Sequence, residues 1–169
     1  MAVFLCGFMG CGKSTIGRLA AKKLGCGFCD TDELIVEKLG MSIPEIFEQK
    51  GEPFFRQQEA ETVQSLGLKK TVVSTGGGAL LNDTTAEVAK NNGTVIFLDV
   101  PFEVCYGRIK DDPKRPIVVN STKEQLEELY NKRRGVYIKN SDASIRCDGS
   151  PVENTDKLID VLKLVERKK

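Results

Sequence analysis

The sequence of 169 residues contains no histidine. Histidine is the commonest general base in enzymes, so a proton acceptor in this chain is expected to be a carboxylate. The six cysteines include one Cys-X-X-Cys pair, Cys26 and Cys29, and a closed zinc site there would need two further ligands. Since no histidine can supply them, we expect these two thiols to serve as small apolar side chains.

The sequence also lacks an excess of charge of either sign and a long apolar run. Lys and Arg number 25 against 24 for Asp and Glu, so the composition does not favour nucleic acid or a membrane surface as a partner. No apolar stretch approaches the roughly 20 residues of a membrane helix, and the run at residues 2–6 is too short for a signal peptide. We therefore expect a monomeric, cytoplasmic protein with one domain over residues 1–169.

A glycine-rich segment, GFMGCGKST at residues 7–15, lies between the apolar run at 2–6 and a helical pattern. Gly, four residues, Gly, Lys and Ser between a strand and a helix is the P-loop in its expected context. Its glycines let backbone N–H groups converge on phosphate oxygens, and the helix beginning near Lys13 adds its positive end. Lys13 is then expected to reach the β- and γ-phosphates, and the Ser14 hydroxyl to ligate Mg²⁺.

The other residues of this loop are expected to contact the phosphates of ATP. Gly10, Cys11 and Gly12 would offer backbone N–H groups, and Thr15 a further hydroxyl donor. Cys11 is in addition a thiol beside a helix N-terminus, a position that can lower a thiol pKa and favour oxidation.

Apolar, β-rich runs recur along the chain with helical patterns between them, at residues 2–6, 27–30, 71–75, 94–99 and 143–147. This alternation predicts an α/β domain of three layers, α/β/α, with a mainly parallel sheet of about five strands and a ligand crevice at their carboxyl ends. Two stretches exceed a simple crossover: a helical insert over about residues 33–61 and a charged, proline-containing segment over about 110–122. We interpret the second as a lid over the phosphates, although a plain surface loop has the same composition.

Asp30 and Asp32 close the second predicted strand. If the strand is still extended at these positions, two residues apart along it, both side chains point to the same face of the sheet and into the crevice. One carboxylate near Mg²⁺ would hold its water ligands, and the other would accept the proton of an attacking hydroxyl. Alternatively, the two aspartates cap the helix that follows; beside a P-loop we favour the functional interpretation.

The segment VVSTGGGA at residues 72–79 predicts a buried strand that ends in three glycines at the same sheet edge. Without side chains, Gly76, Gly77 and Gly78 allow close approach of a ligand to the backbone, although a tight turn would also use them. Ser74 occupies the place where P-loop proteins often carry a residue near the metal.

Taken together and in this order, the motifs resemble the shikimate kinase family over nearly the whole chain. The matching motifs are GFMGCGKST, the DTD at 30–32, FFRQQE at 54–59, STGGGA at 74–79, KRP at 114–116, and Arg133 four residues before Tyr137. The resemblance implies the strand order 2-3-1-4-5 of nucleoside monophosphate kinase-like P-loop proteins. It also implies transfer of the γ-phosphoryl group of ATP, with Mg²⁺, to the 3-hydroxyl of shikimate in the biosynthesis of chorismate and the aromatic amino acids.

The resemblance also implies roles for individual residues. Asp32 looks like the carboxylate that orients the shikimate hydroxyl and takes its proton, and Asp30 like the one that holds Mg²⁺ through water. Contacts to shikimate are implied for Asp32 and for Arg56, Glu59, Gly76, Gly77, Gly78 and Arg133. Arg108 resembles the residue that lies against adenine. Arg115 resembles the lid arginine that meets both phosphate and substrate, which makes it catalytic together with Asp32 and Lys13.

Three points stay open. Arg133 is favoured over the adjacent Arg134 as substrate ligand by its offset from the tyrosine that follows. Pro151 comes only three residues after Asp148, closer than in the family's adenine loop, so the adenine contacts near residues 148–154 are undecided. A related small-metabolite kinase, such as a gluconate kinase, and a regulatory nucleotide-binding module are alternative functions. Regulatory modules usually lack one of Lys13, Asp32 or the arginines, and none of these is missing here.

Overall fold

The computed structural model describes residues 1–67, 69–113 and 115–167 of the chain. Within these residues five strands form one sheet in the order β2-β3-β1-β4-β5, with every neighbouring pair parallel. Their bounds are β1 Ala2–Cys6, β2 Gly27–Asp30, β3 Thr71–Ser74, β4 Gly93–Asp99 and β5 Ala143–Arg146. The predicted parallel sheet and its strand order are therefore confirmed.

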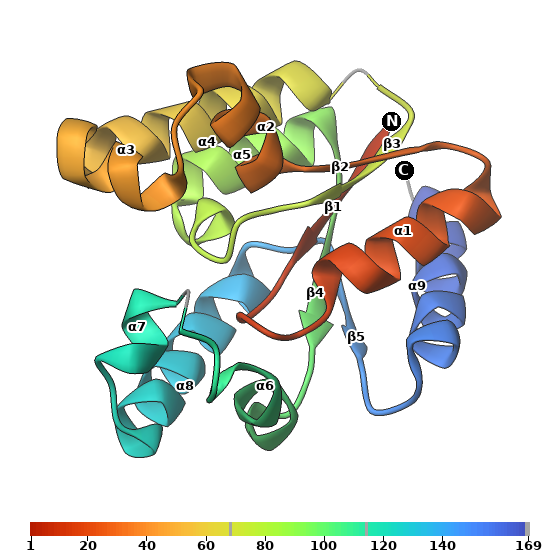
Figure 1. Ribbon diagram of the computed structural model, residues 1–169. Helices are drawn as coiled ribbons and strands as arrows, with labels where there is room; N and C mark the ends of the chain where they lie inside the picture. The colour runs from red at the N-terminus through yellow and green to blue at the C-terminus, as the bar shows by residue number, and fades with distance from the viewer. Residues whose placement is uncertain (68, 114, 168–169) are drawn as a thin grey trace.

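Helices cover both faces of the sheet (Figure 1). On one face lie α1, Lys13–Leu24, and α9, Pro151–Glu166, which pack against each other. On the other face lie α4, Glu52–Leu66, α5, Asp83–Asn92, and α8, Lys123–Lys139, with the 3₁₀ turn η1, Ala79–Leu81, at the end of β3. Because both faces are covered, β1 and β4 are almost continuously apolar and buried, as is typical of parallel sheets. The three-layer prediction is confirmed.

The stretch expected as a helical insert holds α2, Thr31–Leu39, α3, Ile43–Lys50, and the first turns of α4. These helices have a small core of their own around Ile35, Ile46 and Phe55, separate from the main core between sheet and helices. α3 begins with a capping box in which Ser42 and Glu45 satisfy each other's backbone N–H groups. The three helices thus pack as one unit beside the sheet.

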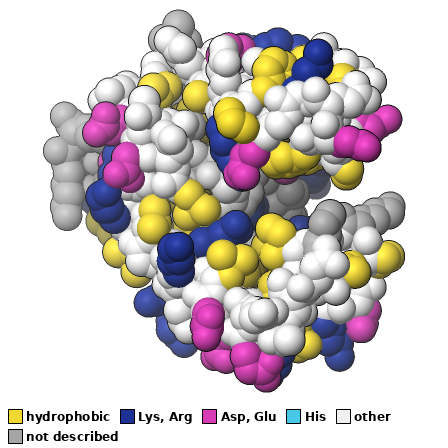
Figure 2. Space-filling view, turned by 90° about the vertical axis from the view of Figure 1, so that its left-hand side faces the viewer, with side chains coloured by type: hydrophobic (Ala, Val, Ile, Leu, Met, Phe, Trp, Pro, Cys, Tyr) yellow, Lys and Arg dark blue, Asp and Glu magenta, His cyan; other side chains and the backbone are white. Residues whose placement is uncertain are grey.

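The segment expected as a lid, residues 110–122, joins α6, Phe102–Ile109, to α8 and includes the short helix α7, Pro116–Val119. Val118 of this segment is buried in the main core, whereas Ile117 and Val119 are exposed. Lys114 of the KRP motif lies outside the described residues. α3 and α7 lie on the same side of the molecule (Figure 1), and Figure 2 looks onto that side and shows the surface hollowed between an upper and a lower part.

Among the described residues, no helix combines the length and apolar character that crossing a bilayer requires.

Candidate active site

The loop between β1 and α1 turns tightly because three of its glycines have positive φ angles, 147° at Gly7, 77° at Gly10 and 90° at Gly12. At Gly10 there is also no room for a side chain, since a Cβ would lie 2.9 Å from the carbonyl oxygen of Cys105 and 2.7 Å from the side chain of Ile109. The loop can therefore pack against α6 only with glycine at this position.

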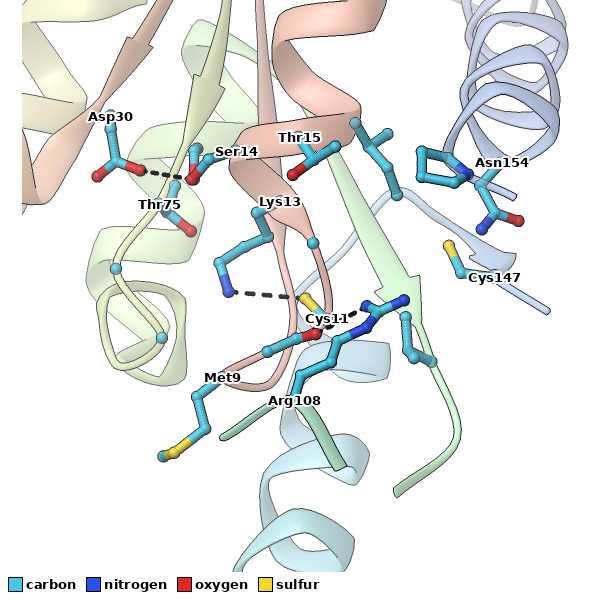
Figure 3. A pocket seen from close by; sticks show the side chains of 18 of the residues that line it. Met9, Cys11, Lys13, Ser14, Thr15, Asp30, Thr75, Arg108, Cys147 and Asn154 are labelled. Carbon is cyan, nitrogen blue, oxygen red and sulfur yellow. Dashed lines mark hydrogen bonds between the residues drawn. The ribbon is translucent and has the colours of Figure 1, made fainter. Parts of the chain in front are cut away.

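Lys13, the first residue of α1, folds back over this loop (Figure 3). Its Nζ donates to the carbonyl oxygens of Gly7 at 2.9 Å and Phe8 at 3.3 Å, and lies 3.6 Å from the Sγ of Cys11. Cys11 itself is buried, so its thiol is covered by the surrounding chain. The ammonium group is thus already held at the loop whose N–H groups are suited to bind phosphate.

Three oxygen-bearing side chains from different elements meet beside this lysine. The Ser14 hydroxyl donates to Oδ2 of Asp30 at 3.0 Å (Figure 3). It also lies 3.2 Å from the Ser74 hydroxyl. Mg²⁺ prefers such oxygen ligands, keeps several waters, and is usually held by one or two carboxylates together with substrate phosphates. The residues present fit this ion. No group of three or more Cys, Asp or Glu side chains that could hold a metal ion occurs in the described part of the chain.

Asp30 ends β2 and also caps the helix that follows. Its Oδ1 accepts a hydrogen bond from the backbone N–H of Asp32 at 3.0 Å, which makes it the N-cap of α2. The chain is therefore already helical at Thr31, and Asp32 lies in the first turn of α2 rather than on an extended strand. The expectation of a shared strand face fails for this reason, yet both carboxylates line the same cavity.

Asp32 and Glu59 each have one buried carboxylate oxygen, Oδ1 and Oε1, without a hydrogen-bond partner in the described residues. Both oxygens face Gly76, where a Cβ would lie 2.5 Å from the first and 2.8 Å from the second. Burial, with the charge of Asp30 as the next cause, raises the pKa of Asp32 to about 6. Burial also raises the pKa of Glu59 to about 7, against the opposing effect of Arg56. Buried acceptors of this kind are unfavourable until a donor reaches them.

Arg56 of α4 contacts both Glu59 and the glycine segment. Its Nη1 donates to Oε2 of Glu59 at 2.6 Å, while Nε and Nη2 donate to Oε1 of Glu52 at 3.2 and 2.9 Å. The guanidinium packs so closely on Gly78 that a Cβ there would clash with Nη1. The hydroxyl of Tyr137 in α8 donates to the carbonyl oxygen of Gly77 at 2.5 Å, so α4, the glycine segment and α8 meet at this point.

The two adjacent arginines of α8 differ in their surroundings. Arg134 pairs with both carboxylate oxygens of Asp99 at the end of β4, Nε to Oδ1 at 2.9 Å and Nη2 to Oδ2 at 2.6 Å. Arg133 is half-buried and lies near Tyr137. Burial raises the pKa of Tyr137, and the charge of Arg133 opposes this rise. Arg134 is thus tied to the sheet, and Arg133 lies beside the tyrosine that holds Gly77.

Two further predicted arginines border the cavity. Nη1 of Arg108 donates to the carbonyl oxygen of Gly10 at 2.9 Å (Figure 3). Arg115 of the 110–122 segment is exposed, and its Nε pairs with Oδ2 of Asp112 at 2.9 Å. Both side chains therefore contact protein groups beside the site.

The far end of the cavity is formed by the connection from β5 to α9 together with the first turn of α9. Cys147, Gly149, Pro151 and Asn154 line it (Figure 3 labels the first and last of these). The side chain of Asn154 closes the turn by accepting from the Gly149 N–H at 3.3 Å and donating to the Gly149 carbonyl oxygen at 2.8 Å. The sequence did not single out Cys147 or Asn154, because the spacing of Asp148 and Pro151 gave no familiar pattern.

The phosphate loop, the two aspartates, the glycine segment and the start of α9 border one cavity of about 530 Å³. Its lining includes most of the predicted site residues, namely Gly10, Cys11, Gly12, Lys13, Ser14, Thr15, Asp30, Asp32, Gly76, Gly77, Arg108 and Arg115. Four others, Arg56, Glu59, Gly78 and Arg133, are outside that lining but next to it. Sequence reasoning missed Glu52, which could have been found from its position four residues before Arg56 on the same predicted helix.

Comparison with known proteins gives one consistent result. The shikimate kinase family model matches residues 9–163. A shikimate kinase from Persephonella marina is 42% identical over 159 residues, which are 93% of this chain and 96% of the relative. The crystal structure of a shikimate kinase from Aquifex aeolicus is 39% identical, with a TM-score of 0.84 and 96% of each chain covered. A shikimate kinase from Acinetobacter baumannii in complex with shikimate is 33% identical, with a TM-score of 0.86 and coverage of 99% of this chain and 94% of the other.

Proposed function

The chain belongs to the shikimate kinase family, and we propose that its cavity is where the γ-phosphoryl group of ATP passes to the 3-hydroxyl of shikimate. The products are shikimate 3-phosphate and ADP, in the biosynthesis of chorismate and the aromatic amino acids. One observation carries the placement of the reaction: the phosphate loop with Lys13 borders the same cavity as Asp32, whose buried Oδ1 has no hydrogen-bond partner among the described residues.

The phosphate loop is proposed to hold the donor. Backbone N–H groups of Gly10, Cys11 and Gly12, the Lys13 ammonium and the Thr15 hydroxyl would bind the β- and γ-phosphates, in exchange for the carbonyl contacts that Lys13 makes without them. Arg108, already bonded to the loop, would lie against adenine.

Ser14 directly and Asp30 through water would hold Mg²⁺. When bound, this ion offsets charge on the phosphate oxygens of the transferring group. Asp30 suits the role because its carboxylate is fixed in orientation. One of its oxygens accepts a hydrogen bond from the α2 backbone, and the other accepts one from Ser14.

Asp32 is proposed to align the attacking hydroxyl and to take its proton. In phosphoryl transfer little covalent work falls to the protein, so positioning of the nucleophile accounts for much of the catalysis. A raised pKa makes Asp32 a stronger base than an ordinary carboxylate. The rest of shikimate would be held by Arg56, Glu59, the backbone of Gly76, Gly77 and Gly78, and Arg133.

Arg115 already borders the cavity, and it is proposed to reach the transferring phosphoryl group when the 110–122 segment closes. In the structure its side chain is exposed and pairs with Asp112, three residues back along its own segment. Movement of this segment toward the phosphates would place the cation near the charge that develops on the γ-phosphoryl group. It would also exclude water, which otherwise competes with the alcohol as acceptor.

A coupled ADP-release assay with alternative acceptors tests this function. Shikimate should support turnover, whereas gluconate and nucleoside monophosphates should leave ADP release at the background rate. Faster turnover with gluconate would indicate a related small-metabolite kinase instead. Tight ATP binding without transfer to any acceptor would indicate a regulatory nucleotide-binding module.

We also propose that the enzyme is monomeric, cytoplasmic and dependent on Mg²⁺, without nucleic acid or membrane partners. Six free thiols are typical of a reducing compartment. Sedimentation at micromolar concentration should give the mass of one chain, 18.6 kDa. Removal of divalent ions by a chelator should abolish shikimate-dependent ADP release, and added Mg²⁺ should restore it.

A further inference from the structure

Arg56 has two carboxylate partners that differ sharply in their exposure to solvent. The side chain of Glu59 is 2% exposed, whereas that of Glu52 is 63% exposed. Both belong to α4, three residues after and four residues before the arginine. The two ion pairs therefore neutralise the same guanidinium in very different environments.

The hydrogen-bond pattern also differs between the two partners. Oε2 of Glu59 accepts a hydrogen bond from Nη1. Its other oxygen, Oε1, is buried, has no partner among the residues the structure describes, and faces Gly76. Nε and Nη2, the edge of Arg56 that could bind a carboxylate with two parallel hydrogen bonds, both donate to the single Oε1 of Glu52. Guanidinium and carboxylate pair more strongly when each of two N–H groups has its own oxygen. Glu52 thus occupies this edge with suboptimal geometry.

The energetic consequences of losing each partner are unequal. Separating Glu59 from Arg56 would leave a buried anion without its counter-ion, which is strongly unfavourable. Separating Glu52 returns an exposed carboxylate to water, and exposed pairs of this kind contribute little. An anion that arrives at Arg56 would therefore displace Glu52 and leave Glu59 in place.

We propose that Glu52 is an exchangeable counter-ion that occupies Arg56 in the free enzyme and is replaced by the carboxylate of the substrate. The inference rests on the proposed function, in which Arg56 binds that carboxylate. Glu52 keeps the guanidinium oriented before binding and competes with the substrate for it. An anionic ligand can replace Glu52 with better geometry, while a neutral analogue cannot. Glu52 therefore weakens the binding of the acid and leaves the binding of its ester unchanged.

The test compares Glu52→Gln with Glu61→Gln at low ionic strength. Glu61 is an exposed residue of the same helix that pairs with Lys38 at 3.2 Å, and it serves as the matched control. Removing the competing charge in Glu52→Gln should lower the Kd of shikimate, measured by calorimetry, about twofold, in line with the small strength of exposed helical pairs. The Kd of shikimate methyl ester, measured by competition, should not change, and Glu61→Gln should change neither.

Several outcomes would overturn the inference. A higher Kd of shikimate in Glu52→Gln would mean that the residue only orients Arg56. Equal shifts for the acid and the ester would indicate a general disturbance of α4, which a thermal melt and Glu52→Ala would reveal independently. A wild-type chain that neither binds nor phosphorylates shikimate would contradict the proposed function itself. The present inference fails instead if wild type is active and Glu52→Gln does not bind the acid more tightly, or tightens the acid and the ester equally.

Discussion

The two halves of the cavity differ in how well their polar groups are satisfied before any ligand arrives. On the nucleotide side, Lys13, Ser14 and Arg108 have protein partners at 2.9, 3.0 and 2.9 Å. On the acceptor side, Asp32 and Glu59 each present a buried oxygen that has no partner in the described chain. The nucleotide side is thus stable by itself, and the acceptor side is relieved only when a ligand supplies donors.

This difference indicates which half determines specificity. Many ligands carry phosphate. When one binds, Lys13 and Ser14 exchange their protein partners for phosphate oxygens and Mg²⁺, which discriminates little between phosphate-containing ligands. Buried acceptors without partners favour a ligand whose hydroxyl groups reach them and disfavour an analogue that lacks those groups. The acceptor half should therefore discriminate among alcohols far more strongly than the nucleotide half discriminates among nucleotides.

The difference between the nucleotide half and the acceptor half is tested most strongly by Asp32→Ala, for which we expect the largest effect. Losing the group that aligns the hydroxyl should lower kcat by about 10³-fold, within the range of lost acid–base and positioning effects. The Kd of ATP should remain near that of wild type, because Lys13 and Ser14 keep their partners. Stopped-flow ADP release and calorimetry with ATP measure the two quantities. Full activity would remove Asp32 from the mechanism, and loss of ATP binding would show that the two halves are not separable.

A smaller effect is expected from Gly76→Ala. The new methyl group would lie 2.5 Å from Oδ1 of Asp32 and 2.8 Å from Oε1 of Glu59, so both carboxylates must move. A shift of about 1 Å in such a group can reduce kcat/KM by roughly 10²-fold. Gly77→Ala, where a Cβ meets nothing within 4 Å, should lose much less and serves as the comparison. Equal losses in the two variants would show that the backbone, and not the carboxylate positions, is what the glycines protect.

The same division separates what could be predicted from sequence from what could not. The phosphate loop is a contiguous segment between a strand and a helix, so its motif and this context predict roles for Lys13 and Ser14. The start of α2 at Thr31 could not be predicted, because Asp30 and Asp32 are both good caps and the structure uses the first. The burial of Glu59 depends on packing between α4 and the glycine segment, which no local pattern determines.

An effect of intermediate size is expected in the pH dependence of the free energy of unfolding, because of the buried carboxyl group of Glu59. The pKa of Glu59 is raised to about 7 in the folded protein from an ordinary value of 4.5, so the folded state holds a proton that the unfolded state has released between these values. The associated stabilisation is complete below pH 4.5 and is lost as the pH rises through about 7. Between pH 5 and pH 8, the free energy of unfolding measured with urea should fall by about 2 kcal/mol more in wild type than in Glu59→Gln. Parallel pH dependence in the two proteins would mean that Glu59 ionises normally.

The smallest effects should separate the two adjacent arginines of α8, which successive helical positions direct about 100° apart. Arg134→Ala removes the paired hydrogen bonds to Asp99, but its side chain is 41% exposed, so the free energy of unfolding should fall by only about 1 kcal/mol. Arg133→Ala should leave stability near wild type and raise the KM of shikimate about tenfold, because a charged contact to the substrate carboxylate is lost. Urea unfolding and steady-state kinetics on both variants give a crossed comparison. The reverse pattern, with KM raised by Arg134→Ala and stability lowered by Arg133→Ala, would move the substrate contact to Arg134 and place Asp99, its partner at the end of β4, within the acceptor half.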